Sequence, residues 1–476
     1  MKKKILLLSC LLFISLLITG CGKKNGKLVL STEAGFAPYE YYSDGKIVGV
    51  DVDIAKEIAD ELNKELVIKD VAFDSIISEV KTEKSDIGAA GISYTEERAK
   101  QVDFTINYAE SKQVIVVKNG SSIINPKSLT NQKVAVQLGT VADSYLTQNY
   151  PNLNIVREKK FLAAIQDLKD DKVSAVVMDE LPATYLISDD MKILESPVII
   201  DYYGMVIKKG NTELLNKANE VIEKLKNDGK IDEFLLAHMG VKNTKKVNKG
   251  VFDSFYYSVI YNARYKYILQ GLLNTILISL GAVIIGVLLG IMASIIRNIH
   301  DNTSRLKLLN AISHIYITII RGTPSILQLM IIYYVIFKQT DINIVIVGIL
   351  SFGINSGAYV AEIIRAGINS VDKGQIEAGY ALGLNYTQVM TKIVFPPALR
   401  NVLPALGNEF ITLIKETSVG AYIGIVELTK ASDIIASRTY DYFFPLILIA
   451  LIYLMITLLL TKLMNRLEKR FNNVRN

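Results

Sequence analysis

The chain has 476 residues, which a soft prior of about 150 residues per domain divides into several units. Hydrophobic residues make up 50% of it and charged residues 21%, so we expect a water-soluble part joined to a membrane part. The net charge of +6 comes from basic residues beside apolar segments, which fits membrane topology better than nucleic-acid binding. With only two cysteines and three histidines, the chain offers neither a disulfide framework nor a metal centre. We expect no cofactor and no metal.

The N-terminus has the layout of a secretory signal. Lys2, Lys3 and Lys4 precede an apolar run over residues 5–18. The run ends in Leu-Ile-Thr-Gly-Cys at residues 17–21, which resembles a bacterial lipobox, where cleavage leaves the cysteine to carry a lipid. We interpret residues 1–21 as a signal peptide and Cys21 as a lipidation site. The alternatives are an uncleaved signal anchor and cleavage at another small residue.

Residues 27–242 alternate short β-branched runs with amphipathic stretches. Runs at 28–30, 134–136 and 175–177 predict buried strands, and Ile54, Ile58 and Leu62 recur at helical spacing. Alternating strands and helices indicate an α/β domain.

A membrane domain follows at residues 267–470, after a linker at 243–266. Residues 267–296 carry no charge and exceed the roughly 20 residues that a spanning helix needs. Four further apolar stretches bring the predicted total to five spans, at about 308–337, 342–364, 402–426 and 443–463. The fourth contains Glu409, Lys415 and Glu416, which could neutralise one another or serve pathway or interhelical roles. We assign none of them to the substrate.

Basic residues set the orientation of these spans. They cluster after the first span, between the third and the fourth, and after the fifth, for example at Arg297, Arg365, Lys392 and Arg466. Positive segments face the cytoplasm, so residues before 267 should lie outside. The exported signal predicts the same topology.

Five short motifs follow one another in residues 27–242. They are S-T-E-A-G-F-A-P-Y at 31–39, G-V-D-V-D at 49–53, A-G-I-S-Y-T-E-E-R at 90–98, Q-L-G-T at 137–140 and M-D at 178–179. Together and in this order they resemble the extracellular solute-binding proteins of polar amino-acid importers. The resemblance implies two α/β lobes that are joined by two crossing strands and close over a ligand. Lobe one would comprise roughly residues 27–113 and 205–240, and lobe two the residues between these segments.

The same resemblance implies a binding site. Arg98 would pair with the α-carboxylate of an amino acid through its planar guanidinium, and Asp179 would meet the α-ammonium. Thr140 opens a predicted helix at 140–150 whose N-terminal amides favour an anion. The implied site residues are Glu33, Phe36, Phe73, Ala90, Gly91, Ser93, Arg98, Gln137, Thr140, Met178 and Asp179.

The side chain of the amino acid stays open at this point. Phe36 and Phe73 would form apolar walls, and Glu33, Gln137 and Met178 would face the ligand side chain. An acidic Glu33 favours arginine or lysine, whereas Glu33 with Gln137 could equally serve glutamine.

The segment between the third and fourth spans carries a second motif. Glu377, Ala378 and Gly379, then Gly383, then Ile393 and Pro396 resemble the E-A-A-x3-G-x9-I-x2-P loop of importer permeases, with Gly379 where alanine is common. The resemblance implies docking of this loop into an ATPase subunit. It also implies a pore built from two permease units.

The partners follow from what the chain lacks. It contains no G-x4-G-K-[ST] sequence, so we expect no enzymatic activity of its own and a separate cytoplasmic ATPase. The expected assembly is a homodimer at the plasma membrane with the binding domain outside, although a heterodimer stays open. An amino-acid-gated channel or a sensor with the same binding domain are the rival functions, but the lobes finish before the first span and no TVGYG-like filter occurs.

Overall fold

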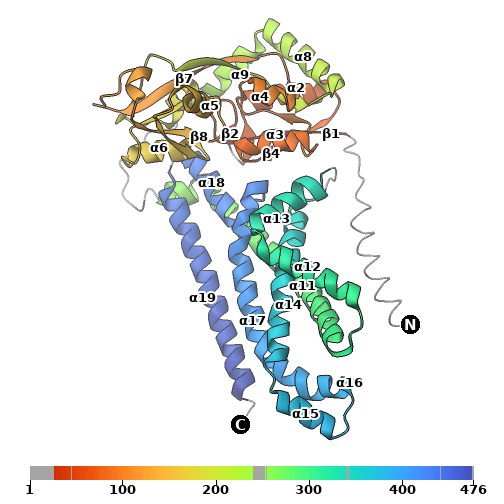
Figure 1. The fold of residues 1–476 in the computed structure, drawn as a ribbon. Helices are drawn as coiled ribbons and strands as arrows, with labels where there is room; N and C mark the ends of the chain where they lie inside the picture. The colour runs from red at the N-terminus through yellow and green to blue at the C-terminus, as the bar shows by residue number, and fades with distance from the viewer. Residues whose placement is uncertain are drawn as a thin grey trace. The chain divides into compact units, whose positions relative to one another are not determined.

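The computed structural model describes residues 26–43, 45–239, 252, 255–338, 342–439 and 441–473. It contains two compact units, an N-terminal α/β part and a C-terminal helical part, and each is considered by itself (Figure 1). The predicted signal peptide with Cys21 and part of the predicted linker lie outside the described residues. The predicted fold class, a two-lobed α/β domain followed by an all-helical domain, is confirmed.

Lobe one is built on a five-stranded sheet with the order β4-β1-β5-β13-β6. Strands β4, β1 and β5 run parallel, and β13 runs antiparallel to its two neighbours. The strands are β1 (Lys27–Thr32), β4 (Glu65–Asp70), β5 (Ile87–Gly88), β6 (Val102–Phe104) and β13 (Val206–Lys208), beside a small hairpin of β2 (Tyr41–Ser43) and β3 (Lys46–Val48). The helices are α2 (Val50–Glu61), α3 (Ile76–Lys81), α4 (Glu96–Ala99), α8 (Thr212–Asn227) and α9 (Lys230–Met239).

Lobe two is built on a six-stranded sheet in which β12 also pairs with β7. Its strands are β7 (Ala109–Lys118), β8 (Lys133–Gln137), β9 (Asn154–Glu158), β10 (Ala175–Asp179), β11 (Met191–Ile193) and β12 (Ile199–Tyr203). Its helices are α5 (Val141–Asn149), α6 (Phe161–Lys169) and α7 (Glu180–Leu186). The antiparallel β7 and β12 lead into and out of this lobe, so they are the two crossing strands expected from the sequence.

The core of each lobe follows from apolar periodicity. Helix α2 buries Ile54 and Ile58 completely, while Lys56 and Asp60 are exposed. Strand β10 buries every residue, as a central strand covered on both faces does. Burying one such isoleucine or valine contributes about 1.5–3 kcal/mol to the stability of the fold. The buried strands and helices therefore hold the residues at their ends in place.

The helical part contains long apolar helices. Within the described residues, three are long and apolar enough to cross a membrane, namely α11 (Tyr265–Thr303), α14 (Ile344–Asn369) and Phe443–Lys469 of α19 (Phe443–Asn473). Helices α11 and α14 approach closely through small residues, since a Cβ on Gly290 would lie 2.4 Å from Val360 Cγ1 and one on Gly286 would lie 2.9 Å from Ser356 Cβ.

The second predicted span is broken. Helix α12 (Lys307–Gly322) and the segment Ser325–Ile336, which begins with α13 (Ser325–Ile331), pass the same test only together and meet at a bend of 114°. Pro324 lies in this break, and Thr323 before it is extended, because proline lacks the N–H that would continue the helix and disfavours helical backbone at the preceding residue. Among the described residues, the count is therefore three spans, or four if the bent pair is one.

The fourth predicted span differs from the expectation at both ends. Helix α17 (Phe395–Glu416) begins before residue 402, with proline in its first turn, and gives way to a 3₁₀ segment at Thr417–Ile423. Helix α18 (Leu428–Thr439) follows. Glu409 accepts a hydrogen bond from Ser356 Oγ of α14 at 2.8 Å, which is an interhelical contact. The predicted count of five spans stays a prediction.

Candidate functional site

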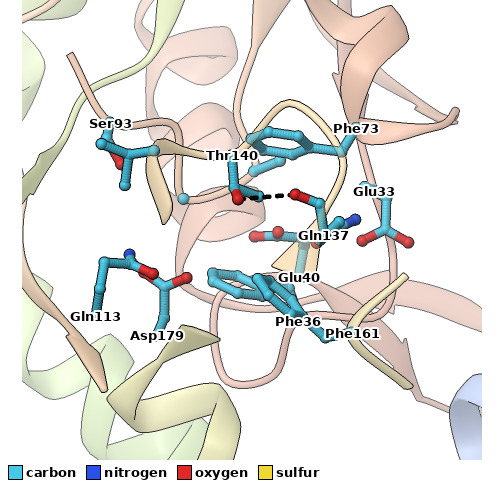
Figure 2. Close-up of a pocket in the computed structure, with 13 residues that line it drawn as sticks. Glu33, Phe36, Glu40, Phe73, Ser93, Gln113, Gln137, Thr140, Phe161 and Asp179 are labelled. Carbon is cyan, nitrogen blue, oxygen red and sulfur yellow. Dashed lines mark hydrogen bonds between the residues drawn. The ribbon is translucent and has the colours of Figure 1, made fainter. Parts of the chain in front are cut away.

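A pocket lies between the two lobes of the α/β part, and side chains from both lobes line it (Figure 2). Many of its residues lie at or just after the carboxyl ends of strands: Glu33 follows β1, Gln137 ends β8 and Asp179 ends β10. Open α/β sheets bind ligands at these ends. The lining residues are Glu33, Phe36, Glu40, Phe73, Ala90, Gly91, Ser93, Gln113, Gln137, Thr140, Val141, Phe161 and Asp179.

Aromatic rings form the apolar walls of the pocket. Phe36 stacks on Phe161 with ring centroids 5.7 Å apart and planes inclined by 24°. Phe73, the second predicted wall residue, also lines the pocket. The apolar stem of a ligand side chain would lie against such rings without leaving polar groups unpaired.

Gly91 and Ala90 bring backbone to the pocket surface. Gly91 has a φ of +53°, and its N–H donates to Asp51 Oδ2 at 3.0 Å. A Cβ at this position would lie 2.5 Å from Phe36 Cε1. Glycine is required here because the backbone is left-handed and the Phe36 ring occupies the space beside it.

A polar cluster closes one end of the pocket. Asp179 Oδ1 accepts hydrogen bonds from Ser111 Oγ at 2.8 Å, from Gln113 Nε2 at 2.6 Å and from the Tyr203 hydroxyl. Burial, followed by the charge of Asp201, raises the pKa of Asp179 to about 7. An ammonium group at this end would restore the ionised carboxylate, since an opposite charge favours the charged form.

Ser93 belongs to the same end. Its Oγ donates to Asp201 Oδ2, and Gln113 Nε2 lies 3.4 Å from Asp201 Oδ1. Burial raises the pKa of Asp201 as well. The two aspartates therefore form an acidic pair around Gln113, which suits a cation that carries several hydrogen-bond donors.

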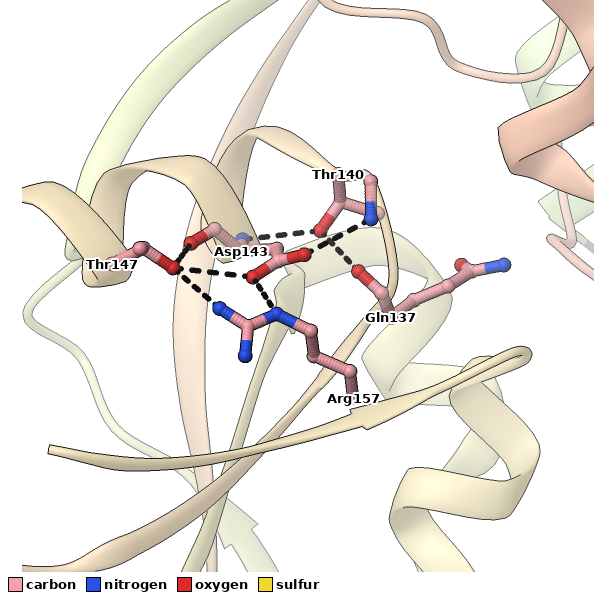
Figure 3. Close-up of polar contacts among 6 residues, drawn as sticks. Gln137, Thr140, Asp143, Thr147 and Arg157 are labelled. Atoms are coloured by element: carbon pink, nitrogen blue, oxygen red, sulfur yellow. Dashed lines mark hydrogen bonds and ion pairs between the residues drawn. The ribbon is translucent and has the colours of Figure 1, made fainter.

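Thr140 is the N-cap of α5, as the sequence predicts. Its Oγ1 accepts from Asp143 N at 3.3 Å and donates to the Gln137 carbonyl oxygen at 2.8 Å. Figure 3 shows how Asp143 then holds the turn, accepting from Gly139 N at 3.1 Å and from Arg157 Nε at 2.8 Å. The start of α5 beside the pocket is thereby fixed by a capping contact and a partly exposed ion pair.

Arg98 lies beside the pocket and is not among its lining residues. Its Nη1 donates to the Ser93 carbonyl oxygen at 2.6 Å, and its Nη2 donates to the Gly139 carbonyl oxygen of lobe two at 2.7 Å. The guanidinium also lies 5.5 Å from the Phe73 ring centroid. Burial lowers the pKa of Arg98 to about 10, which leaves it cationic at neutral pH. Its predicted pairing with a ligand carboxylate stays a prediction.

Glu33 and Gln137 lie together at the other end of the pocket. Glu33 Oε1 is 3.1 Å from Lys160 Nζ, and Gln137 Nε2 donates to the Lys159 carbonyl oxygen at 2.9 Å. Both predicted residues thus line the pocket, and Lys160, which no sequence motif indicated, lies against one of them.

Met178 is placed differently from the expectation. Its side chain is fully buried in the core with Val114 and Val176, and it does not line the pocket. Side chains alternate between the faces of a strand, so the residue before Asp179 in β10 points into the core.

Four lining residues were missed by sequence reasoning: Glu40, Gln113, Val141 and Phe161. Glu40 is fully buried, and this burial together with the nearby Asp51 raises the pKa of Glu40 well above its usual range. Val141 follows the Thr140 cap, so the helix start could have indicated it, whereas Gln113 inside a strand gives no such signal.

The permease motif forms a compact helical hairpin. Helix α15 (Lys373–Ala381) carries Glu377 and Ala378 on its exposed side and buries Gly379, where a Cβ would lie 2.4 Å from Ile393 Cδ1. Figure 1 shows α15 and α16 (Tyr386–Gln388) at one end of α14 and α17.

Gly383 ends the first helix of this hairpin. It has a φ of +78°, and Leu384 N donates to the Gly379 carbonyl oxygen at 3.2 Å, which is the Schellman arrangement. Pro396 is exposed in the first turn of α17. Close packing against Ile393 therefore explains the glycine at position 379, and the left-handed backbone explains the glycine at position 383.

Comparison with known proteins connects both parts to transport. Residues 28–241 match the family described as bacterial extracellular solute-binding proteins, family 3. Residues 282–473 match the family described as binding-protein-dependent transport system inner membrane component.

Individual relatives agree. The chain is 37% identical over 216 residues to the putative glutamine transport system permease protein GlnP of Rickettsia prowazekii, covering 45% of this chain and 97% of that protein. It is 37% identical over 209 residues to the arginine transport system permease protein ArtQ of Bacillus subtilis, covering 44% and 93%.

A solved amino acid ABC transporter substrate-binding protein, AbpA of Streptococcus pneumoniae bound to L-arginine, is 32% identical, with a TM-score of 0.44 over 46% of this chain and 97% of that one. The two family matches and the permease relatives show that the chain belongs to the amino-acid ABC importers, in which it is a fused family 3 solute-binding domain and multi-pass inner-membrane permease domain.

Proposed function

We propose that this chain captures a polar or basic L-α-amino acid, of the glutamine or arginine type, and passes it to its own permease domain. The observation that carries the proposal is the pocket with two polar ends, an acidic cluster around Asp179 and a second polar end at Glu33 and Gln137. The relatives named as glutamine and arginine permeases support the same two substrates.

The binding step follows from the chemistry of the pocket. The α-ammonium occupies the end formed by Asp179 and Asp201, and the α-carboxylate is met by Arg98 and the start of α5. A ligand that touches both lobes stabilises the closed state, because the open state lacks half of these contacts. Phe36 and Phe161 enclose the stem of the side chain.

The energy for transport comes from another chain. A cytoplasmic ATPase docks on the hairpin that carries Glu377 and Gly383, and its closure is transmitted to the spans. Two copies of the permease domain form the pathway, and the binding domain faces the outside, tethered by a lipid on Cys21 or by the first span. The tether supplies an effective concentration of about millimolar for the docking of binder on permease.

Titration of the full-length protein in lipid nanodiscs with the L-amino acids tests the binding step. We expect saturable binding of L-glutamine or L-arginine and none of the corresponding amine or of the α-keto acid, which lack the carboxylate or the ammonium. If none of the L-amino acids binds, the proposal is wrong.

The rival functions separate in a second measurement. Proteoliposomes that contain this chain and its ATPase should accumulate the bound amino acid only with ATP. Ion currents evoked by the amino acid without an ATPase would indicate a channel, and binding without any uptake would indicate a sensor.

A further inference from the structure

The ion pair between Glu33 and Lys160 joins the two lobes at the end of the pocket that Glu33 and Gln137 form. Glu33 follows β1 in lobe one, whereas Lys160 is the N-cap residue of α6 in lobe two. Glu33 Oε1 and Lys160 Nζ are 3.1 Å apart, and the two side chains are only 5% and 14% exposed. A pair so deeply buried interacts more strongly than a surface pair, because water screens it less.

The two ends of the pocket differ in charge, because Arg98 lies near two aspartates at one end and Lys160 lies near Glu33 at the other. Figure 2 shows Glu33 beside Gln137 on one side of the Phe36 ring and Asp179 beside Gln113 on the other. No lysine or arginine, Lys160 included, is among the pocket-lining residues that the structure describes; beside the pocket, Arg98 lies near Asp179 and Asp201, and Lys160 lies against Glu33. At the Glu33 end, Lys160 balances the one carboxylate, and burial raises the pKa of the neighbouring Glu40 well above its usual range.

A ligand side chain therefore meets a region that is close to neutral. A carboxamide finds an oxygen and a nitrogen partner there, in Gln137 and in the Glu33–Lys160 pair, without changing the balance of charge. Glu33 lines the pocket, and a guanidinium or an ammonium that approached it would also lie close to the Lys160 cation, in a place with little water. Discrimination by such a repulsive element is a common route to specificity.

We propose that Lys160 determines specificity, by neutralising Glu33 and so selecting an uncharged amide side chain over a cationic one. This inference rests on the proposed amino-acid binding and names the substrate class of the same site as the glutamine type. Without Lys160, the Glu33 carboxylate becomes the natural partner of a ligand cation, and the preference should move towards arginine.

Arginine and citrulline are the probes that test this inference, since they have nearly the same shape and differ in the charge of the terminal group. The full-length protein in nanodiscs is titrated with L-arginine, L-citrulline and L-glutamine. The wild type should bind citrulline and glutamine more tightly than arginine. Lys160→Met should shift the ratio of the arginine and citrulline Kd values by about tenfold or more towards arginine.

Two further variants separate charge from packing. Lys159→Met removes an exposed lysine one residue away and should leave the ratio unchanged. Glu33→Gln removes the other member of the pair and should weaken arginine further relative to citrulline, because the Glu33 carboxylate then no longer offsets the charge of Lys160. Adding Glu33→Gln to Lys160→Met should abolish the gain in arginine affinity.

The outcomes are distinct from those that test the proposed function. If the wild type prefers arginine to citrulline, or if neither Lys160→Met nor Glu33→Gln changes the ratio, the specificity inference is wrong while amino-acid binding stands. If the wild type binds no amino acid at all, the proposed function fails and this inference fails with it.

Discussion

Arg98 Nη2 donates a hydrogen bond to the carbonyl oxygen of Gly139, and the two atoms are 2.7 Å apart. Arg98 belongs to lobe one and Gly139 to the turn before α5 in lobe two, so this contact bridges the lobes beside the pocket. A planar guanidinium has further donors, which allows one side chain to hold the closed arrangement and to face a ligand carboxylate.

Arg98→Ala should therefore weaken amino-acid binding strongly and leave membrane insertion intact. Truncating one partner of a buried, hydrogen-bonded charge typically costs about 2–5 kcal/mol, and about 1.4 kcal/mol is a tenfold change in Kd. Calorimetric titration of the full-length variant measures the loss. Lys100→Ala, which removes an exposed cation two residues away, is the control. Unchanged affinity in Arg98→Ala would refute its role in the site.

Amino-acid affinity should also depend on pH through Asp179. Its pKa is raised to about 7 by burial and by Asp201, so the free pocket carries a partly protonated carboxyl at neutral pH. A bound ammonium favours the ionised form and lowers this pKa. Affinity should then be highest above pH 7 and fall as the pH is lowered below about 7, with proton release on binding near that pH.

Titrations in two buffers of different ionisation enthalpy measure the released proton. Asp179→Asn should bind weakly and lose the proton release. Arg98 cannot produce the same profile, since its pKa of about 10 keeps it charged throughout this range. A flat affinity profile between about pH 5.5 and 8 in the wild type would contradict the role of Asp179.

Strand ends explain how much of the pocket could be predicted. Glu33, Gln137 and Asp179 lie just beyond short apolar runs that predict buried strands, and ligands collect at the carboxyl ends of such strands. The Met178 side chain lies in the core, because adjacent strand residues point to opposite faces. The start of α6, with Lys160 and Phe161, lies at a distance from β1 that depends on how the two lobes meet, which local sequence does not contain.

The membrane part was predictable in the same uneven way. Long apolar runs predicted α11 and α14 well, because a spanning helix needs little more than length and apolarity. The bend at Thr323 and Pro324 and the early start of α17 at Phe395 were missed, although prolines mark both places. Hydropathy averages over a window, whereas a proline acts at a single peptide bond.

Gly91→Ala should reduce amino-acid affinity by distorting the apolar wall. The new Cβ would lie 2.5 Å from Phe36 Cε1, so the ring must shift, and the φ of +53° adds backbone strain. Gly120→Ala is a matched control, because Gly120 also has a positive φ of 82° but has no atom within 4 Å of the place that a methyl group would occupy. We expect both variants to lose thermal stability through backbone strain, with a larger loss in Gly91→Ala because of the contact with Phe36, and a loss of affinity in Gly91→Ala alone. Equal affinities in the two variants would contradict this account of the pocket wall.

Variants of the docking hairpin should separate binding from transport. Glu377 is exposed on α15, so Glu377→Ala should fold normally, bind the amino acid as the wild type does, and lose ATP-driven uptake in proteoliposomes that contain the ATPase. Gln375→Ala on the same helix is the control for a simple surface change. Gly383→Ala strains the left-handed residue that ends α15, at a cost of about 1–2 kcal/mol, and should lower uptake for a structural reason. Full uptake by Glu377→Ala would count against the docking role. Loss of amino-acid binding in any of these variants would mean that the hairpin influences the pocket, which two separately folded units do not require.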